Sequence, residues 1–181
     1  MEILDIVDEQ LKYIRKIKRC DYDKLNKNEY FLYTHIWVIK DQEILIQKRS
    51  LNRKWAPGMW ATHTGTVISG ETPRITAIRE LKEEINLEIN DNQLINELVV
   101  YPSKIYNLFK GIGYIYFVKC DNIDILIDNK EVIDYKYVSL DKLKAMIASK
   151  KFINYGRDGI DYENYFKTIF EIIEGLMVNA N

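Results

Sequence analysis

Short apolar segments with alternating or continuous hydrophobic positions recur along the chain and predict β-strands. Residues 32–39 and 43–49 form two such segments, and Lys40-Asp41-Gln42 between them predicts a tight hairpin. Later segments are rich in aliphatic and aromatic residues, which favour extended structure. These further predicted strands are residues 94–101, 112–119 and 132–138.

Between these two groups of strands the hydrophobic period changes to that of a helix. Thr72 is suited to cap this helix, and Pro73 suits its first position, where no amide proton is needed. Asn86 follows the last apolar position and tolerates the left-handed conformation that ends many helices. The apolar stripe predicted to dock the helix on the core consists of Ala77, Ile78, Leu81 and Ile85.

Two more helices are predicted toward the C-terminus. Ser139 is placed to cap the first, and the second is expected to begin at Asp161. Their apolar faces comprise Leu140, Leu143 and Ile147 in the first helix and Tyr162, Tyr165, Phe166, Ile169, Phe170 and Ile173 in the second. Strands enclosed by helices in this order predict an α/β (α+β) protein, with a mixed β-sheet sandwiched between helices.

Length and composition agree with one domain spanning residues 1–181, of which residues 1–30 precede the first predicted strand as an N-terminal extension. The chain is 47% hydrophobic and 29% charged, which is ordinary for a globular protein. Its 26 basic and 27 acidic residues nearly cancel, so no global attraction to nucleic acid or to a membrane is expected. Any affinity for phosphate must therefore be local.

The cysteines and the first residues bear on the compartment. Cys20 and Cys120 are too few for a disulfide framework or a zinc site, and they predict two reduced thiols. The first five residues include acids where a signal peptide needs basic and then apolar residues, and no apolar run is long enough to span a bilayer. A cytoplasmic location is expected.

Three carboxylates fall on one face of the helix that follows Thr72. Glu80, Glu83 and Glu84 are separated by three and four positions, so their side chains must crowd together. Like charges placed in this way repel one another unless cations lie between them. Carboxylate oxygens are the ligands that Mg²⁺ and Mn²⁺ prefer, and Mg²⁺ commonly shares its remaining positions with substrate phosphates. The alternative is an ordinary glutamate-rich surface helix.

The whole string around this helix resembles the Nudix box. The matching positions are Gly65, Glu71, Arg79, Glu80, Leu81, Glu83, Glu84 and Leu87, with Asn86 in place of the final glycine of the box. The resemblance implies a Nudix-like α/β/α sandwich in which Glu80, Glu83 and Glu84 bind the metals. It also implies that Arg79 and Glu71 orient the loop and helix, and that the Gly65 carbonyl adds a metal ligand.

A basic segment precedes the box. Its members include Arg49 and Lys54, and cations beside a carboxylate site are suited to bind the remaining oxygens of a diphosphate. The stretch from Gln47 to Trp60 is similar to the corresponding segment of isopentenyl-diphosphate isomerases and the related bacterial Nudix hydrolases. That resemblance implies that Arg49 and Lys54 contact diphosphate. The alternative is a solvated loop.

The residues around the box glycine distinguish a hydrolase from an isomerase within this group of relatives. The isomerases need a cysteine just before the box glycine and a metal site built with histidines, whereas this chain has Thr64 and Thr66 at the corresponding positions. His35 lies within an apolar strand and is expected to be a strand residue with a satisfied side chain. His63 lies just before the box, and whether it contacts substrate is left undecided by the sequence.

These observations predict a metal-dependent pyrophosphohydrolase acting on a nucleoside diphosphate derivative, with Mg²⁺ or Mn²⁺ as cofactor. Glu80 is the first candidate for the general base, and Glu131, a loop acid downstream of the box, is the second. Two other functions stay open: an isoprenoid-diphosphate enzyme, and a catalytically idle Nudix module that binds nucleotides. The aromatic residues of the last helix, with Phe152 and Tyr155 before it, also predict a homodimer contact.

Overall fold

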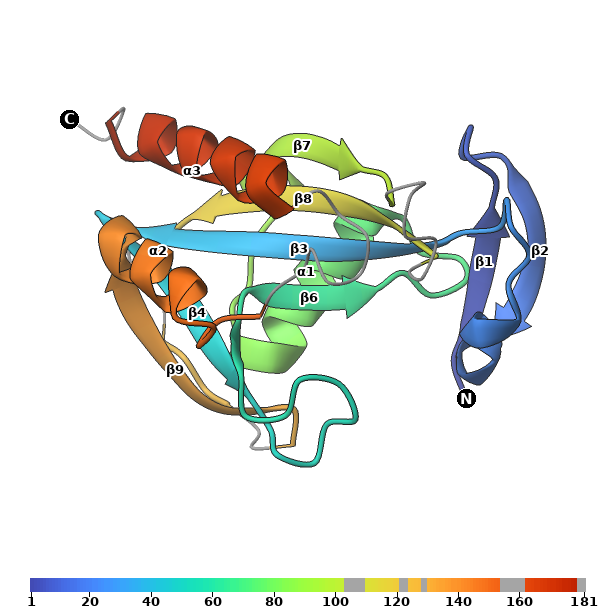
Figure 1. Ribbon diagram of the computed structural model, residues 1–181, viewed down its shortest axis with the longest axis horizontal. Helices are drawn as coiled ribbons and strands as arrows, with labels where there is room; N and C mark the ends of the chain where they lie inside the picture. The colour runs from blue at the N-terminus through green and yellow to red at the C-terminus, as the bar shows by residue number, and fades with distance from the viewer. Residues whose placement is uncertain (103–109, 121–123, 128–129, 154–161, 179–181) are drawn as a thin grey trace.

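The structure is a computed structural model that describes residues 1–102, 110–120, 124–127, 130–153 and 162–178, with the backbone alone at 96–97 and 162–163. Seven strands in these residues form one mixed sheet (Figure 1). Its long central strand, β3, pairs in parallel with β8 and antiparallel with β4 and β6, and every other pairing in the sheet is antiparallel. The strands are β3 (Phe31–Lys40), β4 (Glu43–Arg49), β5 (Trp60–Ala61), β6 (His63–Thr66), β7 (Leu94–Val100), β8 (Gly111–Lys119) and β9 (Val132–Ser139).

Helices cover both faces of this sheet, as the sequence predicted. Helix α1 packs on one face, where Leu81 and Ile85 meet strand residues such as Ile36. Helices α2 and α3 cover the other face. The helical bounds are α1 (Pro73–Ile85), α2 (Leu140–Ala148) and α3 (Tyr162–Val178), with short 3-10 helices η1 (Arg19–Lys24) and η2 (Asp91–Gln93). The α/β/α sandwich with a mixed sheet is therefore confirmed.

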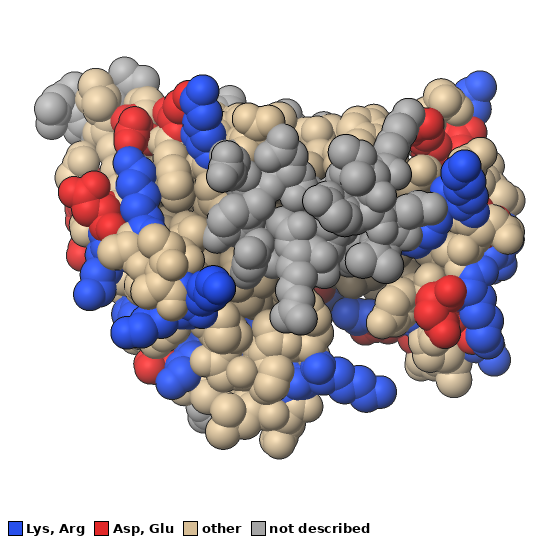
Figure 2. Space-filling view, viewed as in Figure 1, with Lys and Arg blue, Asp and Glu red and all other residues tan. Residues whose placement is uncertain are grey.

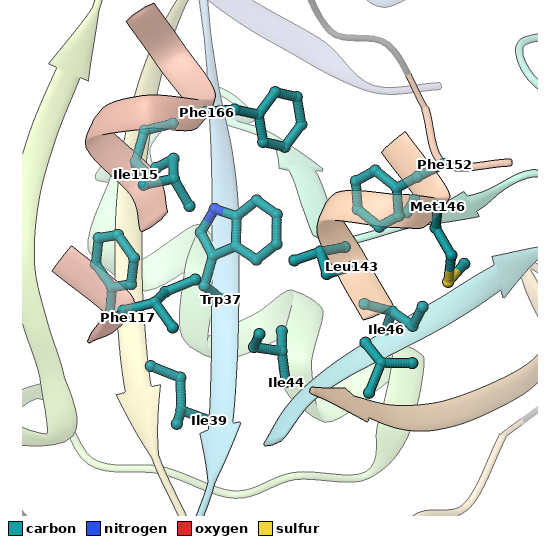
Figure 3. Packing of buried hydrophobic residues seen from close by; sticks show 14 of the residues in the cluster. Trp37, Ile39, Ile44, Ile46, Ile115, Phe117, Leu143, Met146, Phe152 and Phe166 are labelled. Atoms are coloured by element: carbon teal, nitrogen blue, oxygen red, sulfur yellow. The ribbon is translucent and has the colours of Figure 1, made fainter. Parts of the chain in front are cut away.

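The core beneath α2 and α3 is aromatic. Trp37 of β3 lies at its centre, with the Phe152 ring stacked on it at a centroid distance of 6.1 Å and Phe166 of α3 edge-on at 6.4 Å (Figure 3). Tyr165 is also buried, and its hydroxyl lies 2.8 Å from His35 Nδ1. These aromatic rings thus fill their own core, which removes them as a reason to expect a dimer. Tyr155, Asp161 and the side chain of Tyr162 lie outside the described residues.

Burial explains why His35 is a core residue. Its side chain is enclosed between β3 and α3, and this burial lowers the pKa of His35 to about 3. A neutral imidazole that shares a hydrogen bond with a tyrosine hydroxyl is the expected state of such a side chain. His35 therefore belongs to the core, in agreement with its place in an apolar strand.

The N-terminal segment, predicted only as an extension, is folded. Strands β1 (Ile3–Val7) and β2 (Tyr13–Lys18) form an antiparallel hairpin at one end of the large sheet (Figure 1). Arg15 of β2 holds the Glu29 carboxylate through two hydrogen bonds of 2.9 and 2.7 Å. The hairpin packs on the start of β3 through an apolar cluster formed by Leu4, Ile6, Ile17, Leu25, Phe31 and Tyr33. None of the helices in the described residues is long and apolar enough to cross a membrane.

Candidate active site

Helix α1 presents its carboxylates to one side because both of its ends and its apolar face are well defined. The Thr72 hydroxyl accepts a hydrogen bond from the Ile75 amide at 3.3 Å, and Pro73 is the first helical residue. Asn86 ends the helix in the left-handed conformation, at φ 57°, and its amide donates to Lys82 O at 3.1 Å. Leu81 is fully buried against the sheet. The predicted start, end and docking face of this helix are all confirmed.

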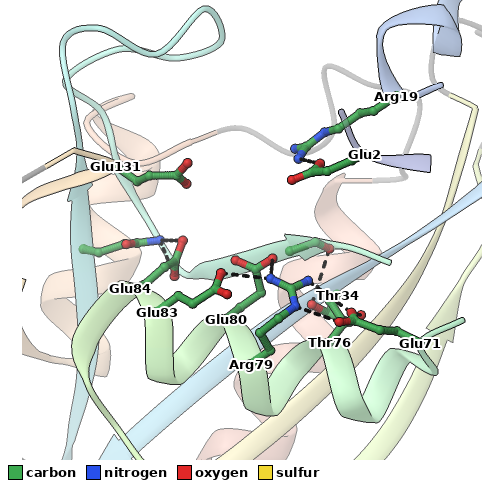
Figure 4. A network of polar contacts seen from close by, with 12 residues as sticks. Glu2, Arg19, Thr34, Glu71, Thr76, Arg79, Glu80, Glu83, Glu84 and Glu131 are labelled. Atoms are coloured by element: carbon green, nitrogen blue, oxygen red, sulfur yellow. Dashed lines mark hydrogen bonds and ion pairs between the residues drawn. The ribbon is translucent and has the colours of Figure 1, made fainter. Parts of the chain in front are cut away.

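Arg79 is the centre of the carboxylate network. Its guanidinium donates to Glu71 at 2.9 and 3.1 Å, to Glu80 at 2.9 Å and to Glu83 at 2.9 Å (Figure 4). Burial lowers the pKa of Arg79, but the hydrogen bonds to Glu71 and the charge of Glu80 outweigh it and raise the pKa overall. Burial raises the pKa of Glu71, but the hydrogen bonds from Arg79 and Thr76 have the larger combined effect, so the pKa of Glu71 is lowered overall. Arg79 therefore links the loop before the helix to two of the three clustered glutamates.

Glu80 packs against the backbone of Gly65. A Cβ on residue 65 would lie 2.2 Å from Glu80 Cγ, so only glycine leaves room for this side chain. The Gly65 carbonyl accepts a long hydrogen bond of 3.4 Å from the Thr34 hydroxyl. Burial and then the negative charge of Glu84 raise the pKa of Glu80 to about 7. The carboxylate of Glu80 thus packs against Gly65 of β6 in a place that disfavours its negative charge.

Glu84 points inward and is held by two polar side chains from the sheet. Gln47 Nε2 lies 3.1 and 3.0 Å from its two oxygens, and His63 Nδ1 lies 3.0 Å from Oε2. His63 is fully buried, and within the described part of the chain its Nε2 has no hydrogen-bond partner. Neither contact was predicted from the sequence. The signal available was a glutamine inside the apolar strand β4, and a polar side chain at such a position requires a buried partner.

The donor set of these residues suits a hard divalent cation. Glu71, Glu80 and Glu83 bring three carboxyl groups against the Arg79 guanidinium, and the charge of Glu84 acts on Glu80. Carboxylate and carbonyl oxygens are the ligands of Mg²⁺ and Mn²⁺. Within the described ranges, no three Asp, Glu, His or Cys side chains converge as a ready metal cluster. Glu80 and Glu83 face Arg79 instead. Arg79 contacts one oxygen of each of these two glutamates, Oε1 of Glu80 and Oε2 of Glu83, while Glu84 is held by Gln47 and His63.

Comparison with known proteins decides the family. The NUDIX domain family matches residues 30–155. The chain belongs to the Nudix family. Over 159 residues it is 30% identical to an uncharacterized Nudix hydrolase of Listeria innocua, a match that covers 86% of this chain and 90% of that protein. It is a Nudix hydrolase, an enzyme of the class that acts on phosphorus-containing acid anhydrides.

Solved structures agree on the Nudix fold. DR0079 from Deinococcus radiodurans superposes with a TM-score of 0.68 at 20% identity, covering 87% of this chain and 95% of that one. A bifunctional NMN adenylyltransferase/ADP ribose pyrophosphatase from Francisella tularensis, complexed with AMP and a Mn ion, gives a TM-score of 0.61 at 21% identity. That match covers 80% of this chain and 42% of the Francisella protein. Both similarities concern the fold.

Outside the Nudix box, Arg49 is bound within its own loop. Its side chain is mostly buried, and it donates to the Trp55 carbonyl at 3.1 and 3.0 Å while its guanidinium lies 5.1 Å from the Trp55 ring centre. Arg49 thus shapes the loop between β4 and β5. Lys54, in the same loop, is exposed. Figure 2 shows the molecular surface notched between this loop and the N-terminal hairpin.

Glu131 lies next to the loop between β4 and β5. Its carboxylate pairs with Arg53, its side chain is 51% exposed, and its carbonyl accepts from the Ser50 amide at 2.8 Å. Figure 4 shows the Glu131 side chain on the side of α1 from which Glu83 and Glu84 project. Glu131 is therefore attached to the loop that carries Arg53, and it faces the same space as the helix carboxylates.

Proposed function

We propose that this Nudix hydrolase is a metal-dependent pyrophosphohydrolase that cleaves the diphosphate linkage of a nucleoside diphosphate derivative. The observation that carries the proposal is the packing of Glu80 on the Gly65 backbone, next to Glu84 and with an excess of negative charge. A carbonyl and several carboxylates in one place are the oxygen ligands that Mg²⁺ or Mn²⁺ takes. The Mn ion and AMP in the Francisella neighbour support the choice of metal and ligand class.

Four residues would hold the cations. These are Glu80, Glu83 and Glu84, with the carbonyl of Gly65. When bound, the cations would neutralise charge on the bridging phosphates and lower the pKa of a water molecule. Gln47 and His63 keep Glu84 oriented, and Glu71 keeps Arg79 beside the helix.

Glu80 is our first candidate to accept the proton from the attacking water. Its pKa of about 7, raised by burial and by Glu84, lies near neutral pH, where a general base works best. Glu131 is the second candidate, because it faces the same space from the loop side. Its pairing with Arg53 must be broken before it can serve.

The basic loop between β4 and β5 would bind the oxygens of the diphosphate that the cations leave free. Lys54 is exposed and is the better placed of the two predicted residues to reach a substrate. Arg49 would contribute mainly by fixing the loop, since its guanidinium is bound to the Trp55 carbonyl. A small-molecule substrate and a cytoplasmic enzyme remain our expectation. The homodimer also stays a prediction, although Phe152, Tyr165 and Phe166, three of the aromatic residues that suggested it, are buried in the core.

Two other functions are weaker. Isomerase chemistry on isoprenoid diphosphates would need a cysteine at position 64. This chain has Thr64 there, on strand β6 opposite His35 of β3. A nucleotide-binding module without catalysis is usually marked by loss of a box glutamate, and Glu80, Glu83 and Glu84 are all present.

The decisive experiment is a substrate screen. Nucleotide sugars, dinucleoside polyphosphates, nucleoside triphosphates and isoprenoid diphosphates would be tested with Mg²⁺ and with Mn²⁺, before and after EDTA. We expect metal-dependent release of a nucleoside monophosphate from at least one nucleoside diphosphate derivative. Glu84→Gln should abolish it, whereas Glu88→Gln, in an exposed pair with Lys82 just beyond α1, should not. Turnover confined to isoprenoid diphosphates, or none at all, would contradict the proposal.

A further inference from the structure

The N-terminal hairpin lies outside the residues that match the Nudix family, which begin at residue 30, yet it contacts the Nudix box. The contact is with the loop of residues 67–72, which runs from β6 to α1. In Figure 1 this loop extends from the end of β6 to the hairpin before it turns back into the helix. The hairpin is therefore a neighbour of the segment that delivers Glu71.

Two hydrogen bonds and one apolar contact join the hairpin to this loop. The Ser69 amide donates to Ile3 O at 2.8 Å, and the Gly70 amide donates to Asp5 Oδ2 at 3.2 Å. Ile68 packs against the apolar cluster of the hairpin. Gly70 has φ +90°, a left-handed conformation that glycine adopts without strain. The turn at Gly70 is thus held by a side chain from outside the family domain.

The same loop is connected to the metal-binding face through a continuous set of polar contacts. The Glu71 amide donates to Ile68 O at 3.0 Å, which places Glu71 directly after the held turn. Its carboxylate receives Arg79 at 2.9 and 3.1 Å. Arg79 Nη1 in turn donates to Glu80 and Glu83, each at 2.9 Å. Movement of the turn would therefore be transmitted to both glutamates.

An aspartate in the middle of β1 needs an explanation, because Asp is disfavoured in strands. One oxygen of Asp5, Oδ1, is buried with no hydrogen-bond partner among the residues that the structure describes, and Lys16 Nζ is 4.0 Å away. Such burial costs free energy unless another interaction compensates for it. The hydrogen bond from the Gly70 amide is the interaction that only a side-chain acceptor at residue 5 can supply.

We propose that Asp5 is a positioning residue of the Nudix site. By accepting from the Gly70 amide it fixes the loop 67–72, and through Glu71 and Arg79 it sets the orientation of the carboxylates that bind the cations. The inference rests on the proposed function in one respect, which is that Glu80 and Glu83 are taken as metal ligands. It also makes the hairpin a part of the catalytic unit.

The test compares two aspartates of the same hairpin. Asp5→Ala removes the acceptor, and Asp5→Asn keeps an acceptor oxygen of the same reach. The matched control is Asp8→Ala, because Asp8 Oδ1 accepts from the Gln10 and Lys12 amides, both at 2.9 Å, in the turn between β1 and β2. If Asp5→Ala does not fold, Asp5→Val replaces it, because valine favours a strand and has no acceptor.

Three quantities are measured for each variant: hydrogen exchange of the Ser69 and Gly70 amides in metal-free protein, Mn²⁺ affinity by electron paramagnetic resonance, and kcat on the substrate found in the screen. KM is determined together with kcat. Asp5→Ala should speed the exchange, weaken Mn²⁺ binding and lower kcat, each by roughly three- to tenfold, the size expected for one hydrogen bond. KM should stay unchanged, and Asp5→Asn should restore all three. Asp8→Ala should lower Tm and leave the three quantities as in the wild type.

Two results would overturn the role of Asp5. One is an Asp5→Ala variant in which the amide hydrogen exchange and the Mn²⁺ affinity are the same as in the wild type. The other is an equal loss in Asp8→Ala, which would mean that any weakening of the hairpin has the same effect. A wild-type protein that hydrolysed nothing in the screen would overturn the proposed function instead, while amide exchange and Mn²⁺ binding would still decide the role of Asp5.

Discussion

Gly65 and Glu80 are in such close contact that a methyl group on residue 65 would lie 2.2 Å from Glu80 Cγ. We therefore expect Gly65→Ala to displace the Glu80 carboxylate or the strand β6. Inserting a methyl group into a packed site typically costs about 1–3 kcal/mol of stability, so the variant should still fold. Turnover and Mn²⁺ affinity should fall by at least about tenfold if the displacement costs 1.4 kcal/mol or more.

The control for this variant is Gly175→Ala in α3. A Cβ there would meet nothing within 4 Å, and alanine favours a helix, so Tm should stay the same or rise and turnover should not change. Full activity in Gly65→Ala would show that the contact with Glu80 has no part in catalysis.

Glu83→Gln and Glu84→Gln should both remove metal-dependent turnover, but their stabilities should differ. Glu83 is 58% exposed and bound to Arg79, so Glu83→Gln should change the free energy of unfolding by less than about 0.5 kcal/mol. Glu84 accepts hydrogen bonds from Gln47 and His63 in a buried place, and an amide cannot accept them all. We expect Glu84→Gln to lose about 1–2 kcal/mol in urea unfolding with EDTA. Near-wild-type activity in either variant would contradict their assignment as metal ligands.

The metal-free protein should become less stable as the pH rises from about 5 to 8. Burial and the charge of Glu84 raise the pKa of Glu80 to about 7, above its value in the unfolded chain. The folded state therefore binds a proton that the unfolded state releases. The resulting stability is fully present below the ordinary glutamate pKa and is lost as the pH rises through about 7. The pKa difference corresponds to at most about 3 kcal/mol.

Urea unfolding in EDTA across this pH range measures that contribution. Glu80→Gln should flatten the dependence, whereas Glu88→Gln, beyond the end of α1, should keep it. An unchanged slope in Glu80→Gln would assign the pH dependence to another group.

Arg49→Ala and Lys54→Ala should separate loop structure from substrate binding. Arg49→Ala removes two hydrogen bonds to the Trp55 carbonyl and the contact with the Trp55 ring, so both stability and turnover should fall. Lys54 is exposed, so Lys54→Ala should leave Tm unchanged. A charged contact to phosphate is worth about 1.5–3 kcal/mol, which predicts a ten- to hundredfold loss in kcat/KM for Lys54→Ala. Wild-type kinetics in Lys54→Ala would favour the alternative that this basic segment is a solvated loop that does not bind substrate.

The helix of the Nudix box was predictable from the sequence because its determinants are local. Thr72, Pro73 and Asn86 specify its ends through neighbouring backbone groups, and the spacing of Glu80, Glu83 and Glu84 places them on one face of any helix. Hydrophobic period likewise predicted β3, β4, β7, β8 and β9 of the large sheet, whereas the short strands β5 and β6 were not predicted. The short hairpin strands at 3–7 and 13–18 were missed.

The partners of the site residues were decided by the tertiary structure. Gln47 and His63 reach Glu84 from two different strands, and Asp5 holds Gly70 from a hairpin 65 residues earlier in the chain. Arg49 donates to the Trp55 carbonyl, a contact that the sequence did not predict. Such contacts depend on how strands and loops pack in three dimensions, and neither spacing nor hydrophobic period contains that information. The chain alone therefore determined which carboxylates share a face, and only the folded protein determined what holds each of them in place.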